Sequence, residues 1–263
     1  MDALPGPGFA ALIQPHTGDL HDFEATERGH SSDVTALATG EKGDWFVKAV
    51  RNRPGGRRDS LVREELINRH VQPISPPIAW RAENDEWLVL GFERVHGRHA
   101  DFAPASSDLP DVVDVVRRIG ALPLPEVAAD WTETRWDRYA TEPALLRGNT
   151  LLYTDINPDN ILISNQAVWA VDWAWPTRGA AFIDPALLVV QLVAAGHAPE
   201  EADAAMAVCP AWENARAAAI DVFADANARM HETFAKRSPD TQWLEDMATA
   251  ARRWADHRAQ RRS

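Results

Sequence analysis

The chain has 263 residues, of which 45% are hydrophobic and 25% are charged, as in ordinary soluble globular proteins. Its formal net charge of -12 argues against a nucleic-acid partner, because the phosphates of DNA or RNA would repel it. The charge permits a cationic small molecule as substrate, although solubility alone explains it as well.

The single cysteine, Cys209, excludes a disulfide framework and a cysteine-rich zinc site within one chain. We therefore expect a reducing, cytoplasmic location, with Cys209 as a small core residue. No apolar run reaches the length of about 18 residues that a membrane span needs, so no membrane partner is expected. The N-terminal residues lack the basic and apolar segments of a signal peptide.

The first third of the chain predicts strands joined by turns. Residues 34–39 and 45–50 are apolar runs separated by Gly-Glu-Lys-Gly-Asp, which is the pattern of a β-hairpin. Residues 75–95 predict a second pair of strands that turns at Glu-Asn-Asp-Glu.

A basic segment and a helix lie between these strand pairs. Residues 51–59 contain Pro54 and two glycines, which predicts a turn. Asp59 or Ser60 can then cap a helix over residues 61–71, whose apolar positions follow a helical period.

Helical patterns dominate after about residue 98. They predict helices at residues 107–122, 135–146, 184–198, 199–208, 210–237 and 241–262. In the last of these, Trp243, Met247, Ala250 and Trp254 share one face, which predicts core packing. The sequence thus predicts an α+β protein with a small β-rich N-lobe, residues 1–97, and a larger, mostly helical C-lobe, residues 98–263.

Acids and amides interrupt two apolar runs in the segment Leu-Leu-Tyr-Thr-Asp-Ile-Asn-Pro-Asp-Asn-Ile-Leu-Ile, residues 151–163. Asp155 and Asn160 lie on the predicted loop, and a second short strand leads to Asp172, so we expect these side chains to converge. Asn160 and Asp172 offer hard oxygen ligands for Mg²⁺, and Asp155 is left to orient or deprotonate an incoming hydroxyl. A turn with Asx-type hydrogen bonds explains the Asn-Pro-Asp-Asn run equally well.

The order of these motifs resembles the aminoglycoside phosphotransferase family, a branch of the protein-kinase-like fold. The family pattern is H-G-D-x-x-x-x-N, a hairpin, I-D and a later D-P, and this chain matches it at Asp155, Asn160, Asp172 and Asp184-Pro185. The chain departs from the pattern at Tyr153-Thr154, where the family usually has His-Gly. The resemblance spans about residues 20–255 and implies a two-lobed, kinase-like architecture.

The resemblance also implies a nucleotide site in the N-lobe. A kinase-like lobe uses a strand lysine to hold the α- and β-phosphates and a helix glutamate to hold that lysine. Lys48 is the only lysine in an apolar strand, and by similarity Glu64 is a better match than Glu65. An edge-strand lysine that extends to solvent is the ordinary alternative.

Two further parts of the nucleotide site are assigned by similarity and position. Ser31 and Ser32 would contact the β-phosphate through backbone N–H groups and a hydroxyl, although a surface turn explains them equally well. Phe92, Glu93 and Val95 lie where the family's hinge pairs with adenine through its backbone, or they are plain edge-strand residues.

Residues after Asp172 have more than one interpretation. We expect Trp173 and Phe182 to be core residues, whereas Trp175 and Arg178 are candidates for the acceptor pocket or for packing. Asp184 is expected to cap a helix, with Pro185 in its first turn, and by similarity it also ties that helix to the loop before it.

Together, these assignments predict an ATP- and Mg²⁺-dependent phosphotransferase acting on a hydroxyl of a small, cationic molecule, such as an aminoglycoside or another natural product. The C-terminal helices offer acids for the pocket of such a cationic acceptor at Glu213, Asp221, Asp225 and Glu232, although a solvated helix face explains these acids equally well. One alternative is a catalytically weak or inactive nucleotide-binding protein that serves as a partner in a biosynthetic or resistance pathway. Another is a kinase for a peptide, a choline-like amine or a sugar.

Overall fold

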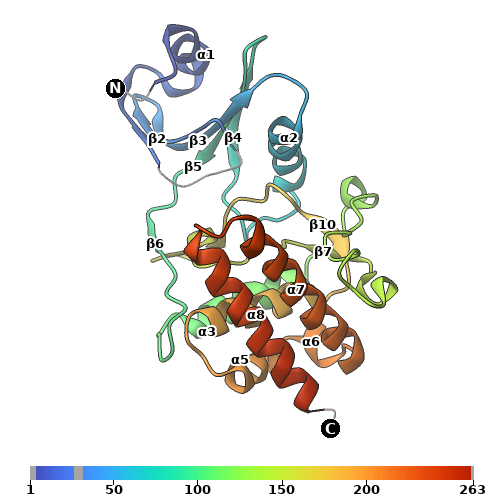
Figure 1. Ribbon diagram of the computed structural model, residues 1–263. Helices are drawn as coiled ribbons and strands as arrows, with labels where there is room; N and C mark the ends of the chain where they lie inside the picture. Colours follow the sequence, from blue (N-terminus) through green and yellow to red (C-terminus); the bar gives the residue numbers. More distant parts are fainter. Residues whose placement is uncertain (1–3, 27–31, 262–263) are drawn as a thin grey trace. The chain divides into compact units, whose positions relative to one another are not determined.

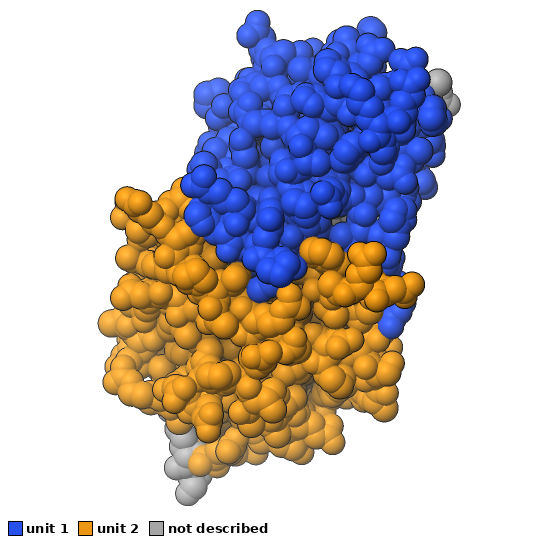
Figure 2. All heavy atoms as spheres, turned by 180° about the vertical axis from the view of Figure 1, so that it is seen from behind, with its two compact units in different colours: residues 1–98, 171–175 blue, residues 99–170, 176–263 orange. Residues whose placement is uncertain are grey.

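The computed structural model describes residues 4–26 and 32–261. The chain divides into two compact units, which Figure 2 colours separately. Unit 1 contains residues 1–98 and 171–175, and unit 2 contains residues 99–170 and 176–263. The sequence placed 171–175 with the C-lobe, but these residues group with unit 1 because Asp172 and Trp173 bind side chains there.

Unit 1 is built on a five-stranded antiparallel sheet in the order β1-β2-β3-β5-β4 (Figure 1). The strands are β1 (Leu20–Ala25), β2 (Val34–Gly40), β3 (Gly43–Arg51), β4 (Ile78–Glu83) and β5 (Trp87–Glu93). Both predicted strand pairs are confirmed, as β2 pairs with β3 and β4 pairs with β5. In β5, which lies between β3 and β4, Gly91 is required because a Cβ there would lie 2.0 Å from the Trp80 ring of β4.

Side chains alternate between the two faces of this sheet and so enter two separate cores. The first core packs against α1 (Pro7–Thr17) and includes Phe9, Ile13, Val47, Ala49 and Val89. The second core packs against α2 (Gly56–Asn68) and includes Val50, Leu61, Leu88, Leu90 and Phe92. Lys48 lies two residues before Val50, so the period of a strand directs it to the α2 face.

Helix α2 begins earlier than the sequence predicts. Its N-cap is Gly55 and its first residue is Gly56, whereas Asp59 and Ser60 already lie in the helix. Gly55 has φ 148°, a conformation open to glycine that lets the chain turn directly into the helix. The predicted cap at Asp59 or Ser60 is therefore wrong, and Asp59 instead places its charge near the positive end of the helix dipole.

Unit 2 is mainly helical. Its helices are α3 (Leu109–Gly120), α4 (Ile183–Ala194), α5 (Pro199–Ala205), α6 (Pro210–Glu213), α7 (Ala217–Arg237) and α8 (Gln242–Gln260). Helices α7 and α8 pack along each other (Figure 1). No helix in the described parts of the chain combines the length and apolar character that crossing a membrane requires.

Short strand pairs support the loops of unit 2. β7 (Thr150–Leu152) pairs with β10 (Thr177–Gly179), and β8 (Ile161–Ser164) pairs with β9 (Val168–Ala170). The strand β6 (Gly97–His99) spans the boundary between the two units. These pairs confirm the predicted extended pieces on both sides of loop 153–160.

The helix predicted at residues 135–146 is wrong. Only a 3₁₀ turn forms there, over Pro143–Leu146. Proline disfavours the helical conformation of the residue before it, and Glu142 accordingly has φ -134° and ψ 75°.

Buried side chains confirm most of the predicted core of unit 2 and correct one part of it. Cys209, Phe182 and Trp254 are buried. Trp243 is 62% exposed, so the core-facing stripe predicted along α8 does not include it. Trp243 lies in the first turn of α8, and the buried positions of this helix begin only at Ala248.

His231 on α7 should make the stability of unit 2 depend on pH. Burial lowers the pKa of its imidazole from 6.5 to about 4, so the unfolded chain binds the proton more readily. The free energy of unfolding should therefore fall as the pH is lowered from about 6.5 to 4, by up to roughly 3 kcal/mol. Chemical denaturation across this range should show a flatter profile for His231→Gln. The same replacement of the exposed His21 should change nothing, and equal slopes for wild type and His231→Gln would contradict the prediction.

Candidate active site

Three charged side chains of unit 1 form an ion-pair cluster, here called the lysine cluster. Lys48 comes from β3, Glu64 from α2 and Asp172 from the segment 171–175. Lys48 Nζ lies 2.8 Å from Glu64 Oε1 and 2.9 Å from Asp172 Oδ1. Lys48 and Glu64 are buried, whereas the Asp172 side chain keeps 21% of its surface exposed.

The lysine cluster combines one ammonium with two carboxyl groups. Burial disfavours the charged ammonium, but the attraction of Asp172 and Glu64 outweighs burial and raises the pKa of Lys48. Burial also raises the pKa of Glu64, and Lys48 opposes this effect while the charge of Asp172 adds to it. With all three groups charged, the cluster has a surplus negative charge beside a partly exposed oxygen donor, which a hard cation would relieve.

Trp173 fixes the position of Asp172 in unit 1. Its backbone N–H donates a hydrogen bond of 3.2 Å to Glu64 Oε1, and its indole is buried, as predicted. Asp172 itself has φ 61°, in the left-handed region that aspartate tolerates better than most residues. The carboxylate is thus presented to Lys48 by a backbone that is anchored at the next residue.

Unit 2 carries the other predicted residues on loop 153–160, which follows β7. Asp155 is exposed between the buried residues Thr154 and Ile156. The Asn160 Nδ2 donates to the carbonyl oxygen of Asp155 at 3.0 Å, which leaves the amide oxygen Oδ1 as the atom suited to a metal ion.

Asn157 completes the hydrogen bonds of this loop. Its Nδ2 donates to Asp155 Oδ1 at 3.1 Å, and its Oδ1 accepts the N–H of Asn160 at 3.1 Å. The latter bond caps the 3₁₀ turn Pro158–Asn160. The Asx-type turn that the sequence allowed is therefore present, and it holds Asp155 and Asn160 in place.

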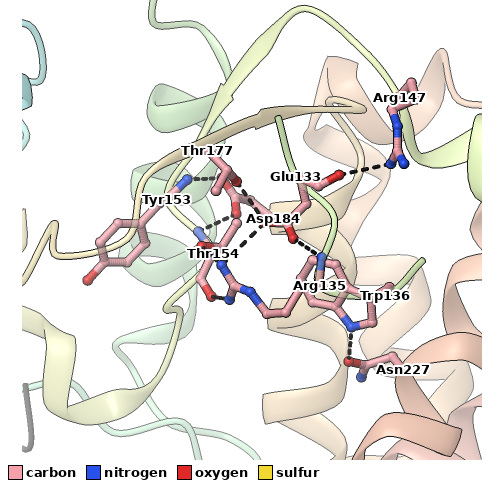
Figure 3. Close-up of polar contacts among 9 residues, drawn as sticks. All are labelled: Glu133, Arg135, Trp136, Arg147, Tyr153, Thr154, Thr177, Asp184 and Asn227. Atoms are coloured by element: carbon pink, nitrogen blue, oxygen red, sulfur yellow. Dashed lines mark hydrogen bonds and ion pairs between the residues drawn. The ribbon is translucent and has the colours of Figure 1, made fainter. Parts of the chain in front are cut away.

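Asp184 anchors the beginning of this loop (Figure 3). Its Oδ2 accepts the N–H of Tyr153 and its Oδ1 accepts the N–H of Thr154, both at 2.8 Å. Burial raises the pKa of Asp184 to about 6, although both N–H groups act to lower it. Its predicted role as a helix cap is wrong, because the N-cap of α4 is Phe182 and Asp184 lies in the first turn. The contact with the loop that the resemblance implied is confirmed.

Asp184→Asn should destabilise unit 2 although the shape of the side chain is conserved. An amide has one acceptor oxygen, so its NH₂ group would face the N–H of either Tyr153 or Thr154. Two buried donors, the new NH₂ group and the backbone N–H, would then face each other without an acceptor. This should lower the free energy of unfolding by about 2 kcal/mol. Urea denaturation at neutral pH measures this. Asp159→Asn, a change to an exposed acid of the same loop, should cost far less, and equal losses would contradict the prediction.

The predicted phosphate loop is only partly described. Ser31 lies outside the described residues. Ser32 precedes β2 and is partly exposed. Asp33 follows it, accepts the N–H of Arg51 at 2.8 Å and pairs with Arg57. A role for Ser31 and Ser32 in phosphate binding stays a prediction.

The predicted hinge residues lie at the end of β5. Phe92 is buried, and its ring centre is 5.7 Å from Lys48 Nζ. The N–H of Glu93 already donates to the carbonyl of Pro77 at 3.1 Å. Val95 follows the strand, and no backbone partner for its N–H occurs within residues 4–26 and 32–261. A role for these three residues in binding adenine stays a prediction.

Arginines neutralise most of the acids that the sequence offered for a cationic acceptor. Asp221 pairs with Arg258, Asp225 with Arg229 and Glu232 with Arg252, each at 2.7 Å. Glu213 is exposed. The α7–α8 acids therefore brace the two helices and supply little free negative charge to a ligand.

The two pocket candidates after Asp172 lie in different units. Trp175 belongs to unit 1, is 44% exposed and has the guanidinium of Arg63 5.8 Å from its ring centre. Arg178 lies in β10 of unit 2, where its Nη2 donates to Thr132 Oγ1 at 3.3 Å.

Sequence reasoning missed Glu133 and Arg135, which support loop 153–160. Glu133 is buried, and Arg135 donates to Thr154 Oγ1 at 2.9 Å. The signal in the sequence was weak: an acid and a base flanked by Trp131 and Trp136, in a segment that the helical pattern obscured. Among the described residues, no group of three or more His, Cys, Asp or Glu side chains is placed to hold a metal ion.

The fold, with the lysine cluster in unit 1 and loop 153–160 in unit 2, is that of a two-lobed, protein-kinase-like protein. No protein-family model and no curated protein sequence matches the chain. Choline kinase LicA from Streptococcus pneumoniae, also solved with AMP, shares its fold with a TM-score of 0.64 at 11% identity, covering 94% of this chain and 97% of LicA.

Two further solved structures share this fold. A thermostable mutant of aminoglycoside phosphotransferase APH(4)-Ia gives a TM-score of 0.55 at 13% identity, covering 96% of this chain and 99% of that chain. Amicoumacin kinase hAmiN, in complex with AMP-PNP, Ca²⁺ and Ami, gives 0.57 at 11% identity, covering 89% and 88%. The predicted α+β, kinase-like fold is confirmed, and the resemblance to aminoglycoside phosphotransferases is confirmed as a likeness of fold.

Proposed function

We propose that this protein transfers the γ-phosphoryl group of ATP to a hydroxyl of a small, cationic molecule. The lysine cluster is the observation that carries the proposal. A strand lysine, a helix glutamate and an aspartate about 124 residues beyond the lysine meet within 3 Å of one ammonium, as a kinase-like nucleotide site requires. Two carboxylates beside one ammonium leave surplus negative charge at the partly exposed Asp172, which a bound cation would offset.

Each residue of the cluster has a proposed role in binding the nucleotide. The Lys48 ammonium pairs with oxygens of the α- and β-phosphates, and Glu64 holds it in position. The backbone at Glu93 and Val95, beside Phe92, binds the adenine, and the segment of Ser31 and Ser32 binds the β-phosphate.

Two side chains are proposed to hold Mg²⁺. Asp172 supplies a partly exposed carboxylate, and Asn160 supplies an amide oxygen whose partner nitrogen is already bonded to the Asp155 carbonyl. Both are hard oxygen donors of the kind that Mg²⁺ prefers. When bound, Mg²⁺ supplies positive charge that neutralises the phosphate oxygens.

Asp155 is the proposed catalytic residue. Its exposed carboxylate accepts the proton of the acceptor hydroxyl while a bond forms between that oxygen and the γ-phosphorus. The bond from the γ-phosphorus to the bridging oxygen breaks, and ADP leaves. The bond that Asn157 donates to Asp155 Oδ1 fixes the orientation of the carboxylate.

The proposed acceptor class has independent support. Proteins of the same fold are named as kinases or phosphotransferases for choline, an aminoglycoside and amicoumacin. Choline and aminoglycosides combine a hydroxyl with positive charge, and the net charge of -12 favours such ligands.

A nucleotide-consumption screen tests the proposed function. Purified protein with MgATP is offered choline, aminoglycosides and other hydroxylated amines, and each amine is paired with an uncharged polyol of similar size. We expect faster ADP release with at least one cationic alcohol, absent in Asp155→Asn, and a product heavier by one phosphoryl group. Phosphorylation of polyols alone would overturn the cationic class, and the absence of any transfer would overturn the function.

One observation favours a second candidate, a nucleotide-binding protein without transferase activity. Tyr153 and Thr154, directly before Asp155, stand where the family that the chain resembles usually has His-Gly. Calorimetry with Mg²⁺ and AMP-PNP separates the candidates, because binding without turnover across the whole acceptor panel would favour this one.

A further inference from the structure

Thr154 adopts a backbone conformation that its own side chain disfavours. Its φ of 63° lies in the left-handed region, which is disfavoured for an L-residue with a Cβ. Threonine is β-branched, so it is a poorer candidate for this region than glycine, asparagine or aspartate. Such a conformation persists only where the surroundings determine it, and residue 154 directly precedes the exposed Asp155.

Three hydrogen bonds hold residue 154 in this conformation (Figure 3). Its N–H donates to Asp184 Oδ1 at 2.8 Å. Its hydroxyl Oγ1 accepts from Arg135 Nη2 at 2.9 Å, and its carbonyl accepts from Arg135 Nη1 at 3.4 Å. Arg135 thus grips both the side chain and the backbone of the strained residue with the two ends of one planar guanidinium.

Arg135 is held in turn by a buried carboxylate. Glu133 is 3% exposed, and its Oε2 accepts from Arg135 Nη2 at 3.2 Å and from Thr177 Oγ1 at 2.8 Å. The other oxygen, Oε1, accepts the backbone N–H of Arg135 at 2.6 Å. The guanidinium therefore has little freedom to turn away from Thr154, although its side chain is 37% exposed.

We propose that Arg135 is a positioning residue that keeps Thr154 in its left-handed conformation and thereby presents Asp155 to the acceptor. This inference rests on the proposed function only for its effect on turnover, since the effect on the loop is conformational. Its distinctive consequence is a coupling: glycine at position 154 adopts a positive φ without strain, so a Thr154→Gly chain no longer needs Arg135.

Four variants test this coupling: Arg135→Gln, Thr154→Gly, the double variant and Arg138→Gln. Arg138 is the matched control, because it is an exposed arginine of the same segment that stacks on Tyr139 and lies outside this network. Two quantities are measured for each variant. One is hydrogen exchange of peptides covering residues 150–157, and the other is the rate of MgATP hydrolysis with water as acceptor, as kcat and KM. Arg135→Lys, which keeps the charge but not the fork, serves as a conservative variant.

In the Thr154 background, Arg135→Gln should raise loop exchange and lower kcat, each by about tenfold, with KM changed by less than about twofold. Arg135→Lys should give an intermediate loss. In the Thr154→Gly background, Arg135→Gln should change both quantities by less than about threefold. Arg138→Gln should behave as wild type, and thermal denaturation confirms that every variant is folded.

Two results would overturn the proposal. One is an effect of Arg135→Gln that is equally large in the Thr154→Gly background, since Arg135 would then act independently of the strain. The other is hydrogen exchange of the loop that is no faster in Arg135→Gln than in Arg138→Gln. If the wild type neither hydrolyses ATP nor transfers phosphate, the proposed function fails, and the exchange measurement alone decides the role of Arg135.

Discussion

Asp155→Asn should lower the rate constant of phosphoryl transfer by about a thousandfold while leaving the affinity for Mg²⁺ and AMP-PNP within about twofold. Asparagine has the same shape as aspartate, and its Oδ1 still accepts the bond from Asn157, so the loop keeps its conformation. What is lost is the carboxylate that takes the proton of the attacking hydroxyl. Single-turnover assays measure the transfer step, and calorimetry measures nucleotide binding.

The same substitution should leave stability almost unchanged. Asp155 is exposed, so Asp155→Asn should shift the free energy of unfolding by no more than about 0.5 kcal/mol. The matched control is Asp159→Asn, another exposed acid of the same loop, which should retain transfer. Transfer at the wild-type rate by Asp155→Asn would remove Asp155 from the mechanism, and equal losses in both variants would show that the general charge of the loop matters instead.

Lys48→Met should abolish nucleotide binding and also destabilise unit 1 by about 3 kcal/mol at neutral pH. Removing the ammonium leaves Glu64 and Asp172 together without a counter-charge, and Glu64 is buried. Glu64 would then take up a proton, so the variant should regain stability as the pH is lowered. Chemical denaturation at several pH values and calorimetry with AMP-PNP measure the two effects.

A double variant separates stability from binding at this cluster. Lys48→Met with Glu64→Gln removes one charge of each sign, so it should recover much of the lost stability without recovering nucleotide binding. Lys236→Met, at an exposed lysine of α7, should alter neither quantity. If Lys48→Met bound AMP-PNP as tightly as wild type, the lysine cluster would be structural, and the proposed nucleotide site would be wrong.

Local sequence patterns correctly predicted those features of unit 1 that are determined by residues close together in the sequence. The hairpin of β2 and β3 follows from two apolar runs around a glycine-rich turn, and the period of a strand places Lys48 on the same face as Val50. The start of α2 was predicted wrongly because the helix begins at a glycine, Gly56, which helical propensity disfavours.

Long-range packing accounts for the features that the sequence left open. Asp184 was expected to cap its own helix and, by similarity, to tie that helix to the loop. Only the second expectation holds, because Asp184 binds the N–H groups of residues 153 and 154, about 30 residues earlier in the chain. The acids of α7 were open to a ligand or to solvent, but arginines of α7 and α8 neutralise them. The periodicity of one segment does not indicate which distant side chain will pair with a charged residue.

The sequence by itself determined the strand pairs of unit 1, the face of Lys48 and the turn that places Asp155 beside Asn160. Each depends on residues within a few positions of one another, whose backbone preferences and hydrogen bonds act locally. Only the tertiary structure decided that Asp172 joins Lys48 and Glu64 in unit 1, and that Arg135 grips the strained Thr154. These contacts join segments 19 to 124 residues apart, and the burial of charge selects such partners only once the chain has packed.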